Sequence, residues 1–187
     1  MAIIIVLLAF IKYFEIDRYM LRRLYPKTYS EYVEMASEKY DVAEDLIFAI
    51  IKNESNFKNS ISSNKGAQGL MQLMDDTANW IAPQVPIENF NVFRIKEPEL
   101  NIQLGCWYLS YLEQQFDGDL TLIVAAYNAG SGNINKWLSD ESYSKDGKTL
   151  TSIPYRETKE YVIKIKINQI IYDFLLKVNF YDIEPTI

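Results

Sequence analysis

The sequence predicts an all-α fold in a single domain, and three observations lead to this prediction. No stretch of convincing length alternates apolar and polar residues, as a half-buried strand would. Several stretches instead repeat apolar residues at the spacing of one helical face. With 187 residues, 49% of them hydrophobic and 24% charged, the chain can bury a sizeable core and is too apolar for disorder. At most, residues 85–92 and 149–153 form a small β-hairpin.

The first eleven residues, MAIIIVLLAFI, form an unbroken apolar run that Lys12 ends. The run is shorter than the roughly 20 residues of a spanning helix. It also lacks the basic start and the A-x-A cleavage site of a secretory signal. Basic residues follow it at Arg18, Arg22, Arg23 and Lys27. We expect residues 1–25 to be a signal-anchor-like segment and link that takes residues 26–187 across a membrane. A buried N-terminal helix is the alternative.

Two helices are expected next. Thr28 and Glu31 are placed to cap a helix that ends near Tyr40. Asp41 is a candidate N-cap for the following helix, with Glu44 three residues later as in a capping box. The apolar positions of this second helix follow one buried face: Val42, Ala43, Leu46, Ile47, Ile50 and Ile51.

The next position on that buried face is Glu54, which lies four residues after Ile50 and seven after Ile47. A carboxyl group withdrawn from water loses hydration, which disfavours the charged form and raises the pKa. A raised pKa suits a general acid that works near neutral pH. The other interpretation is that the helix frays at Asn53 and that Glu54 points to water. Periodicity alone leaves both interpretations open.

Loops and helices alternate in the middle of the chain. Residues 56–68 have the Asn, Ser and Gly content of a loop. Asp75 is a candidate cap for a helix that runs through Ile81. Pro98 is tolerated in a first helical turn, so we expect it to open a long helix that continues to Phe116.

Three helices are expected in the last third of the chain. Asp119 is placed to cap a short apolar helix that reaches Tyr127. A tight break at residues 128–132 separates it from another short helix, which ends at Leu138. The last element is a long amphipathic helix over about residues 157–178.

The composition excludes several classes of function. The formal net charge is −6 and no basic stripe is present, which argues against nucleic acid as a partner. The chain has no histidine, so Ser-His-Asp catalysis, Cys-His catalysis and His-based metal sites are excluded, and we expect no metal or other cofactor. The single Cys106 cannot form an internal disulfide; we expect it in the core, with a reactive thiol as the alternative. Proton transfer therefore falls to Asp, Glu, Tyr or Lys.

Four separated stretches carry the candidate chemistry. They are ES at 54–55, GAQGLMQLM at 66–74, AYNAG at 126–130 and IPYRETKEYV at 153–162. Together with Asn101, Gly105 and Tyr108, they resemble the lytic transglycosylases of the soluble murein transglycosylase (SLT) type, which are relatives of goose-type lysozyme. The resemblance covers about residues 29–176 and implies a lysozyme-like helical domain.

The resemblance also implies an activity. Enzymes of this type cleave the β-1,4 bond between N-acetylmuramic acid and N-acetylglucosamine in peptidoglycan, and a 1,6-anhydro end forms when the sugar's own 6-hydroxyl attacks the anomeric carbon. Glu54 would be the acid for the leaving oxygen and then the base for the 6-hydroxyl. The substrate-binding residues would be Ser63, Gln72, Met74, Tyr127, Asn128, Glu157 and Tyr161. Peptidoglycan glycan strands would be the partner, which places the domain outside the cytoplasm, in the cell envelope, secreted or anchored by residues 1–11.

The distribution of carboxylates is consistent with this activity. Ordinary glycosidases use two carboxyl groups, one on each side of the bond. Residues 55–74 contain no Asp or Glu, so a site built on Glu54 needs a nucleophile from the substrate, such as the 6-hydroxyl or the 2-acetamido group. Glu157 is the only other candidate in a motif, and we expect it to stay ionised and to orient donors. The alternatives are a goose-type lysozyme-like hydrolase and a catalytically silent cell-wall-binding or scaffold module.

Overall fold

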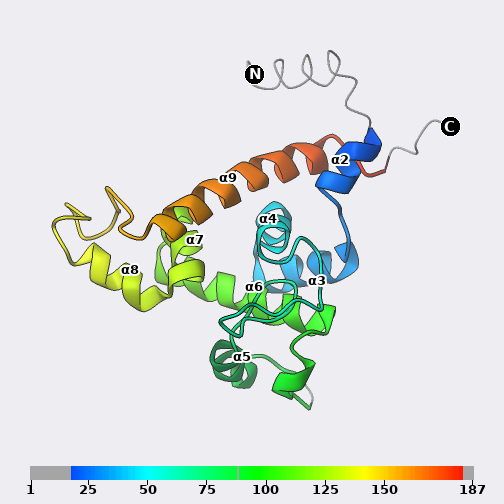
Figure 1. Ribbon diagram of the computed structural model, residues 1–187, viewed down its shortest axis with the longest axis horizontal. Helices are drawn as coiled ribbons and strands as arrows, with labels where there is room; N and C mark the ends of the chain where they lie inside the picture. The colour runs from blue at the N-terminus through cyan, green and yellow to red at the C-terminus, as the bar shows by residue number, and fades with distance from the viewer. Residues whose placement is uncertain (1–17, 88, 183–187) are drawn as a thin grey trace.

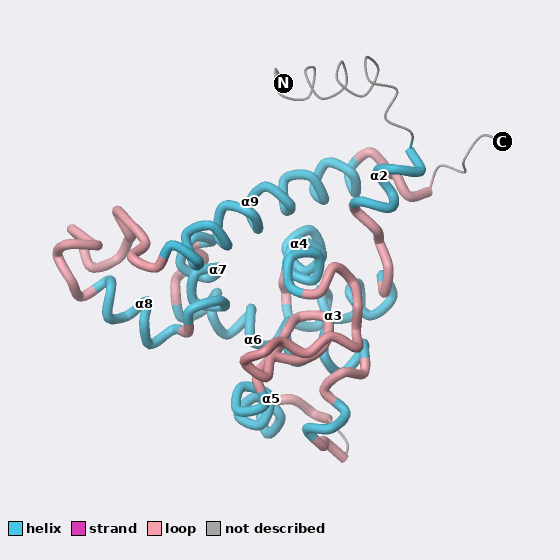
Figure 2. Tube along the Cα trace, in the orientation of Figure 1, coloured by secondary structure: helices cyan, strands magenta, loops and turns pink. Residues whose placement is uncertain are grey.

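The computed structural model describes residues 18–87 and 89–182, and these residues form helices joined by loops (Figure 1). The described part contains no strand, only isolated bridges that join Gln68 to Ser62 and to Leu73 (Figure 2). The all-α prediction is confirmed. The small hairpin allowed for at residues 85–92 and 149–153 does not form in the described residues.

The physical reason lies in local bonding. The first expected strand, residues 85–92, lies between two short 3-10 helices. These are η1 (Ala82–Gln84), which ends just before it, and η2 (Val92–Arg94), which begins at its last residue. On the other side, Thr149 and Thr151 donate their backbone N–H groups to Asp146 and Tyr143, within their own loop. Both segments therefore satisfy their backbone without pairing with each other.

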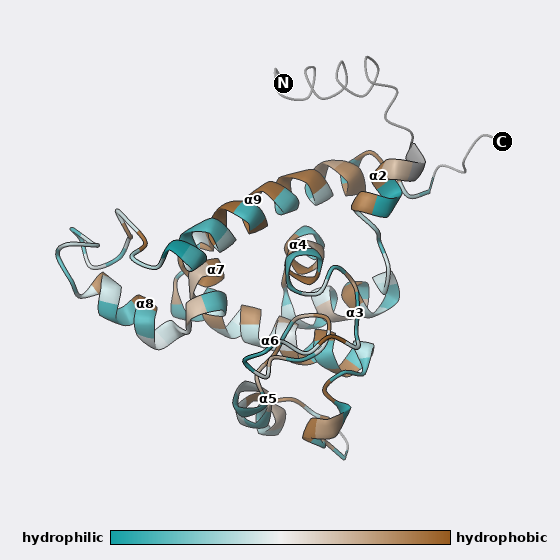
Figure 3. Ribbon diagram, in the orientation of Figure 1, coloured by the Kyte–Doolittle hydropathy of each residue, from teal (hydrophilic) through white to brown (hydrophobic). Residues whose placement is uncertain are grey.

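The helix α4 (Glu44–Glu54) is the centre of the fold. Every residue from Leu46 to Ile51 is buried, so the helix is covered all round rather than on one face. It packs between α9 (Arg156–Lys177) and α3 (Ser30–Tyr40), and Figure 1 shows it end-on beneath α9. Figure 3 shows the apolar character of α4.

Both capping predictions for α3 and α4 are wrong. Asp41 ends α3 in the left-handed conformation, with φ 54°, and its N–H donates to Ser37 O. The N-cap of α4 is Ala43, without a side-chain bond, and that of α3 is Tyr29 rather than Thr28. The acidic Glu44 lies in the first turn of α4, where the helix dipole stabilises a negative charge.

The later helices follow the predictions more closely. The structure has α5 (Asp75–Ile81), α6 (Pro98–Gln115), α7 (Leu120–Ala129) and α8 (Ser131–Leu138). Asp119 caps α7 as predicted, because its carboxylate accepts from the N–H groups of Thr121 and Leu122. Asp75 is not a cap: it is the first residue of α5, and its carboxylate accepts from Gln68 Nε2 at 2.6 Å.

The break after α7 is tighter than predicted. The helix continues to Ala129, and Gly130 alone turns the chain into α8, with φ 85°. This backbone conformation strains residues that carry a Cβ, which explains the glycine. As a result, Tyr127 and Asn128 lie in the last turn of a rigid helix and not in a loop.

The two ends of the described chain lie beside each other. Arg22, on α2 (Arg18–Leu24), donates to the carbonyl oxygens of Phe180 and Tyr181, and Tyr181 Oη donates to Tyr25 O at 2.7 Å. The apolar run at residues 1–11 lies outside the described residues. Within 18–87 and 89–182, no helix combines the length and the apolar character that crossing a membrane requires. The division into 1–25 and 26–187 stays a prediction.

Candidate active site

Glu54 is the last residue of the buried helix α4. The helix does not fray before it: Ser55, the next residue, is buried, and its Oγ donates to Ile51 O at 3.1 Å. The Glu54 side chain is largely withdrawn from water, and burial raises its pKa from 4.5 to about 7. The Glu54 carboxyl therefore has the raised pKa that its position in the sequence predicted. The alternative, a helix that frays at Asn53, is wrong.

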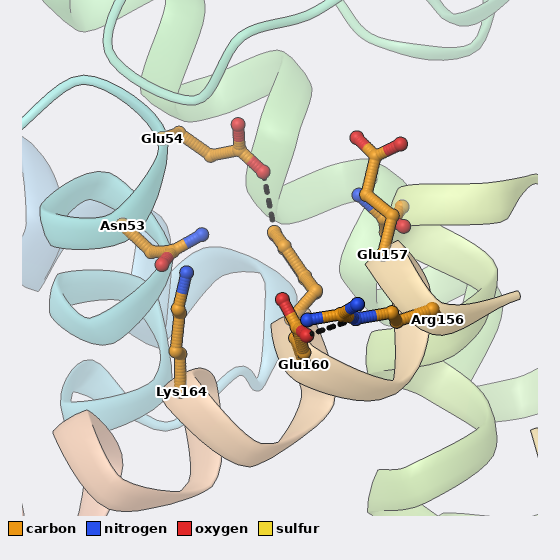
Figure 4. A pocket seen from close by; sticks show the side chains of 8 residues that line it. Asn53, Glu54, Arg156, Glu157, Glu160 and Lys164 are labelled. Atoms are coloured by element: carbon orange, nitrogen blue, oxygen red, sulfur yellow. Dashed lines mark hydrogen bonds and ion pairs between the residues drawn. The ribbon is translucent and has the colours of Figure 1, made fainter.

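Tyr161 on α9 holds one oxygen of this carboxyl. Its hydroxyl donates to Glu54 Oε1 at 2.6 Å, and the bond lowers the pKa of Glu54, against the larger effect of burial. Burial raises the pKa of Tyr161 itself, so the phenol keeps its proton and remains a donor. Figure 4 shows the bonded oxygen pointing toward α9 and the other oxygen pointing away from it.

The loop between α4 and α5 supplies one wall of the site. Ser63 Oγ accepts from the backbone N–H of Ala67 at 3.0 Å, which leaves its own proton available. Gln72 is in a left-handed backbone conformation, and its Nε2 donates to Gly69 O at 2.8 Å, so its amide oxygen remains available. Met74 is 42% exposed at the start of α5. The wall therefore offers polar atoms beside an apolar side chain.

Asn101 on α6 holds this loop in place. It is fully buried, its Oδ1 accepts from Met71 N at 2.7 Å, and its Nδ2 donates to Gln68 O and Ile95 O at 3.0 and 2.8 Å. A side chain on Gly69 would collide with the Asn101 amide. The buried amide thus explains the glycine beside it and fixes the position from which Gln72 extends.

The last turn of α7 supplies the opposite wall. Tyr127 Oη donates to Met71 O at 2.9 Å, which joins α7 to the loop. Asn128 Oδ1 accepts from the buried Thr158 Oγ1 at 2.8 Å, which joins α7 to α9 and leaves the Asn128 NH₂ group available. These two bonds position both walls around Glu54.

A cleft of about 390 Å³ lies between these walls, and we call it the Glu54 cleft. All predicted site residues except Tyr161 line it, together with Asn64, Lys65 and Ala67. Tyr161 lies behind Glu54 instead and touches the site through its hydroxyl. The structure thus brings residues from α4, the loop, α7 and α9 to one place.

A second cavity of about 480 Å³ lies between α4 and α9, and we call it the charged pocket. It adjoins the first cleft, with which it shares Glu54, Asn128 and Glu157. Its lining includes four residues that the sequence prediction missed: Asn53, Arg156, Glu160 and Lys164. Arg156 and Glu160 lie in the motif at residues 153–162 but were not assigned to the site, and Asn53 and Lys164 belong to no motif. The four residues meet where α9 packs on α4. In the part of the chain that the structure describes, no group of three His, Cys, Asp or Glu side chains gathers as a metal site requires.

Comparison with known proteins agrees with the geometry. The family model described as "Transglycosylase SLT domain" matches residues 31–150. The soluble lytic murein transglycosylase of Salmonella typhimurium is 33% identical over 144 residues, which are 76% of this chain and 22% of that protein. A putative soluble lytic murein transglycosylase of Haemophilus influenzae is 34% identical over 165 residues, 86% of this chain and 26% of that one.

Solved structures show the same relationship. The structure of an inactive glutamate-to-glutamine mutant of the lytic transglycosylase Slt from Pseudomonas aeruginosa superposes with a TM-score of 0.71 at 32% identity. It covers 83% of this chain and 25% of that one. The chain therefore spans about a quarter of the length of these relatives. On its sequence, its helices and the residues around Glu54, the chain belongs to the family of transglycosylase SLT domains.

Proposed function

We propose that this domain is a peptidoglycan lytic transglycosylase, which cleaves the β-1,4 bond between N-acetylmuramic acid and N-acetylglucosamine and leaves a 1,6-anhydro end. The observation that carries the proposal is the state of Glu54. Its carboxyl lies at an open cleft but is withdrawn from water, and its pKa is raised to about 7. Such a group holds a proton at neutral pH and can transfer it to a substrate oxygen.

The first half of the reaction is protonation of the bridging oxygen. Tyr161 occupies Oε1 of Glu54, so Oε2 is the oxygen that carries the proton to the substrate. As the proton moves to the bridging oxygen, the bond between that oxygen and C1 of N-acetylmuramic acid breaks. The electron pair leaves with the oxygen, which becomes the 4-hydroxyl of N-acetylglucosamine. The 2-acetamido oxygen of N-acetylmuramic acid stabilises the positive charge at C1.

The second half closes the anhydro ring. The 6-hydroxyl oxygen of the same sugar bonds to C1, and its proton moves to the Glu54 carboxylate. Glu54 ends the cycle protonated, as it began, and no water is consumed. A pKa near neutrality serves both steps, because the group must release a proton and then recover one.

Glu157 is assigned a supporting role. It lies opposite Glu54 (Figure 4), but its side chain is 78% exposed and forms only a long ion pair, at 3.9 Å, with Lys65 Nζ. A carboxylate so well solvated does not share the environment of Glu54. We assign it to orienting donors such as the substrate's acetamido N–H.

Hydrolysis of the lysozyme kind is the second candidate, and one observation favours it. Glu157 faces the cleft opposite the acid, as the general base of an inverting glycosidase does. In that reaction water replaces the 6-hydroxyl, and the product is a reducing end. The two candidates therefore differ in the mass of the product by one water.

Mass spectrometry of muropeptides from digested peptidoglycan separates the two reactions. We expect wild-type protein to produce 1,6-anhydro ends, Glu54→Gln to produce none, and Glu157→Gln to retain the anhydro product at reduced rate. Reducing ends that take up isotope from labelled water would establish hydrolysis instead. Equal clearing of cell walls by wild-type and Glu54→Gln protein would overturn the catalytic assignment and leave a silent binding module.

The place of action follows from the substrate. Peptidoglycan lies outside the cytoplasmic membrane, so we propose that the domain acts there, tethered or exported by the apolar run at residues 1–11. The names of the relatives support murein as the substrate. Fractionation of cells that express the full chain, with and without residues 1–11, tests the tether: removal is expected to leave the protein inside the cell.

A further inference from the structure

Four aromatic side chains that the reaction above does not use gather where α5 packs on α6 (Figure 1). The ring of Trp80, on α5, meets three rings of α6 nearly at right angles. The centroid distances are 5.5 Å to Trp107, 6.1 Å to Tyr108 and 5.0 Å to Tyr111. Trp107 and Tyr111, one helical turn apart, lie almost parallel, at 10°. We call these four side chains the aromatic patch.

The aromatic patch is partly open to solvent. Trp80 is 44% exposed and Tyr111 is 37% exposed, whereas rings that only fill a core are covered. The other two rings, Trp107 and Tyr108, pack partly against a cluster of buried apolar side chains and so give the patch a fixed base. Exposed apolar surface that is gathered in one place, on rigid elements, is typical of a binding surface.

The patch is continuous with the Glu54 cleft. The ring of Tyr108 lies 5.5 Å from the ring of Tyr127, which lines the cleft. The helix α5 also begins at the cleft, because its N-cap, Met74, lines the cleft as well. A ligand that extends out of the cleft past Tyr127 or Met74 therefore comes to Trp80 and Tyr111.

The chemistry of the patch suits a sugar. A sugar ring has faces made of C–H groups and a rim of hydroxyl groups. The electron-rich face of an aromatic ring attracts such C–H groups, and the indole N–H of Trp80 and the hydroxyl of Tyr111 can bond to the rim. None of the four side chains is charged, and the saccharide backbone of peptidoglycan carries no charge either.

We propose that Trp80 and Tyr111 bind a sugar of the same glycan strand beyond the sugars held at Glu54, and that the domain therefore binds long strands more tightly than short ones. This inference rests on the proposed function and leaves its chemistry unchanged. The patch acts on binding alone, because none of its members lines the Glu54 cleft. Since the contact is uncharged, salt should not weaken it.

Glycan strands of two lengths test the proposal. The probes are a disaccharide and an octasaccharide of alternating N-acetylglucosamine and N-acetylmuramic acid, both without stem peptides. The octasaccharide can occupy the cleft and the patch together, whereas the disaccharide is too short to do so. Affinity is measured by calorimetry in Glu54→Gln protein, so that the result does not depend on turnover.

The second substitutions are Trp80→Ala, Tyr111→Ala and Trp80→Phe, which keeps a ring. Phe93→Ala is the matched control, because Phe93 is an aromatic side chain of η2 that is 89% exposed and lies outside the patch. Retained binding of the disaccharide shows in addition that a variant is folded.

We expect Trp80→Ala and Tyr111→Ala each to weaken binding of the octasaccharide by about three- to tenfold, as for the loss of one ring contact, and to leave binding of the disaccharide unchanged. Trp80→Phe and Phe93→Ala should keep the preference for the octasaccharide. An equal loss on both probes, or no loss on either, would overturn the proposal. Anhydro ends from wild-type protein test the proposed function separately, so the two failures are distinguishable.

Discussion

Tyr161 Oη donates to Glu54 Oε1 at 2.6 Å, and this bond joins the end of α4 to the first turns of α9, 107 residues further along the chain. The bond stabilises the ionised form of the carboxyl, whereas burial between the same two helices disfavours that form. Burial is the larger effect, and the pKa of Glu54 rises to about 7. The acidity of Glu54 is thus set by the contact between these two helices.

The first prediction concerns the pH dependence of catalysis. Because Glu54 must be protonated to act as an acid, kcat/KM is expected to be constant below its pKa and to fall about tenfold per pH unit above about 7. The measurement is a pH profile of anhydro-muropeptide release at substrate concentrations well below KM. A profile that rises through this range would contradict the assignment of Glu54 as the acid.

The second prediction concerns Tyr161→Phe. Loss of the hydroxyl removes the bond that lowers the pKa of Glu54, so the pKa should rise further and the alkaline limb of the profile should move to higher pH. The rate should fall as well, because Oε1 is no longer held. Tyr172→Phe is the control: its hydroxyl donates to Pro26 O, away from the site, and its removal should lower stability without shifting the profile.

The third prediction concerns stability. The folded pKa of Glu54 lies above the unfolded value of 4.5, so the folded state binds the extra proton, and wild-type stability should fall as pH rises from about 4.5 to about 7. Glu54→Gln removes this titration. At pH 8 the variant should be more stable than wild type by on the order of 1–3 kcal/mol, with little difference near pH 4. Urea unfolding at both pH values measures this, and an unchanged difference would refute it.

The fourth prediction concerns the support of the loop. Asn101→Ala leaves Met71 N, Gln68 O and Ile95 O without their partner, and we expect a loss of about 3 kcal/mol in the free energy of unfolding. Activity should fall further than stability explains, because Gln72 is no longer held.

Asn79 on α5 is exposed, so Asn79→Ala is the matched control and should change neither quantity. Denaturant unfolding and the rate of anhydro-muropeptide release are the two measurements. Full activity of folded Asn101→Ala protein would show that the loop does not depend on this amide.

The fifth prediction concerns Cys106. Burial among apolar side chains raises the pKa of its thiol well above the usual range, so little thiolate forms and thiol reagents should not modify the folded protein. Unfolded chain should react at one thiol per molecule, since the sequence contains one cysteine. Rapid labelling of folded protein would favour the reactive-thiol alternative.

Features that depend on neighbours in the chain could be predicted. The first-turn proline at Pro98 and the cap at Asp119 act within a few residues, and the structure has them as expected. The apolar spacing of α4 correctly placed Leu46, Ile47, Ile50 and Ile51 in the core, but the helix is buried all round rather than on one face. The position of Glu54 on the buried stripe likewise followed from spacing. The motifs indicated which other residues belong with it, and all of them except Tyr161 line one cleft.

Features that depend on contacts between distant segments could not be predicted from the sequence. Asp41 matched a capping box, yet it takes a left-handed conformation that ends the preceding helix, because the chain must turn there to pack α3 on α4. The charged pocket exists only where α9 crosses the end of α4. The same crossing excludes water from Glu54. Exclusion of water is a property of packed surfaces rather than of any one residue. The raised pKa of Glu54 could therefore be anticipated from the sequence, but it was established only by the folded helices around the side chain.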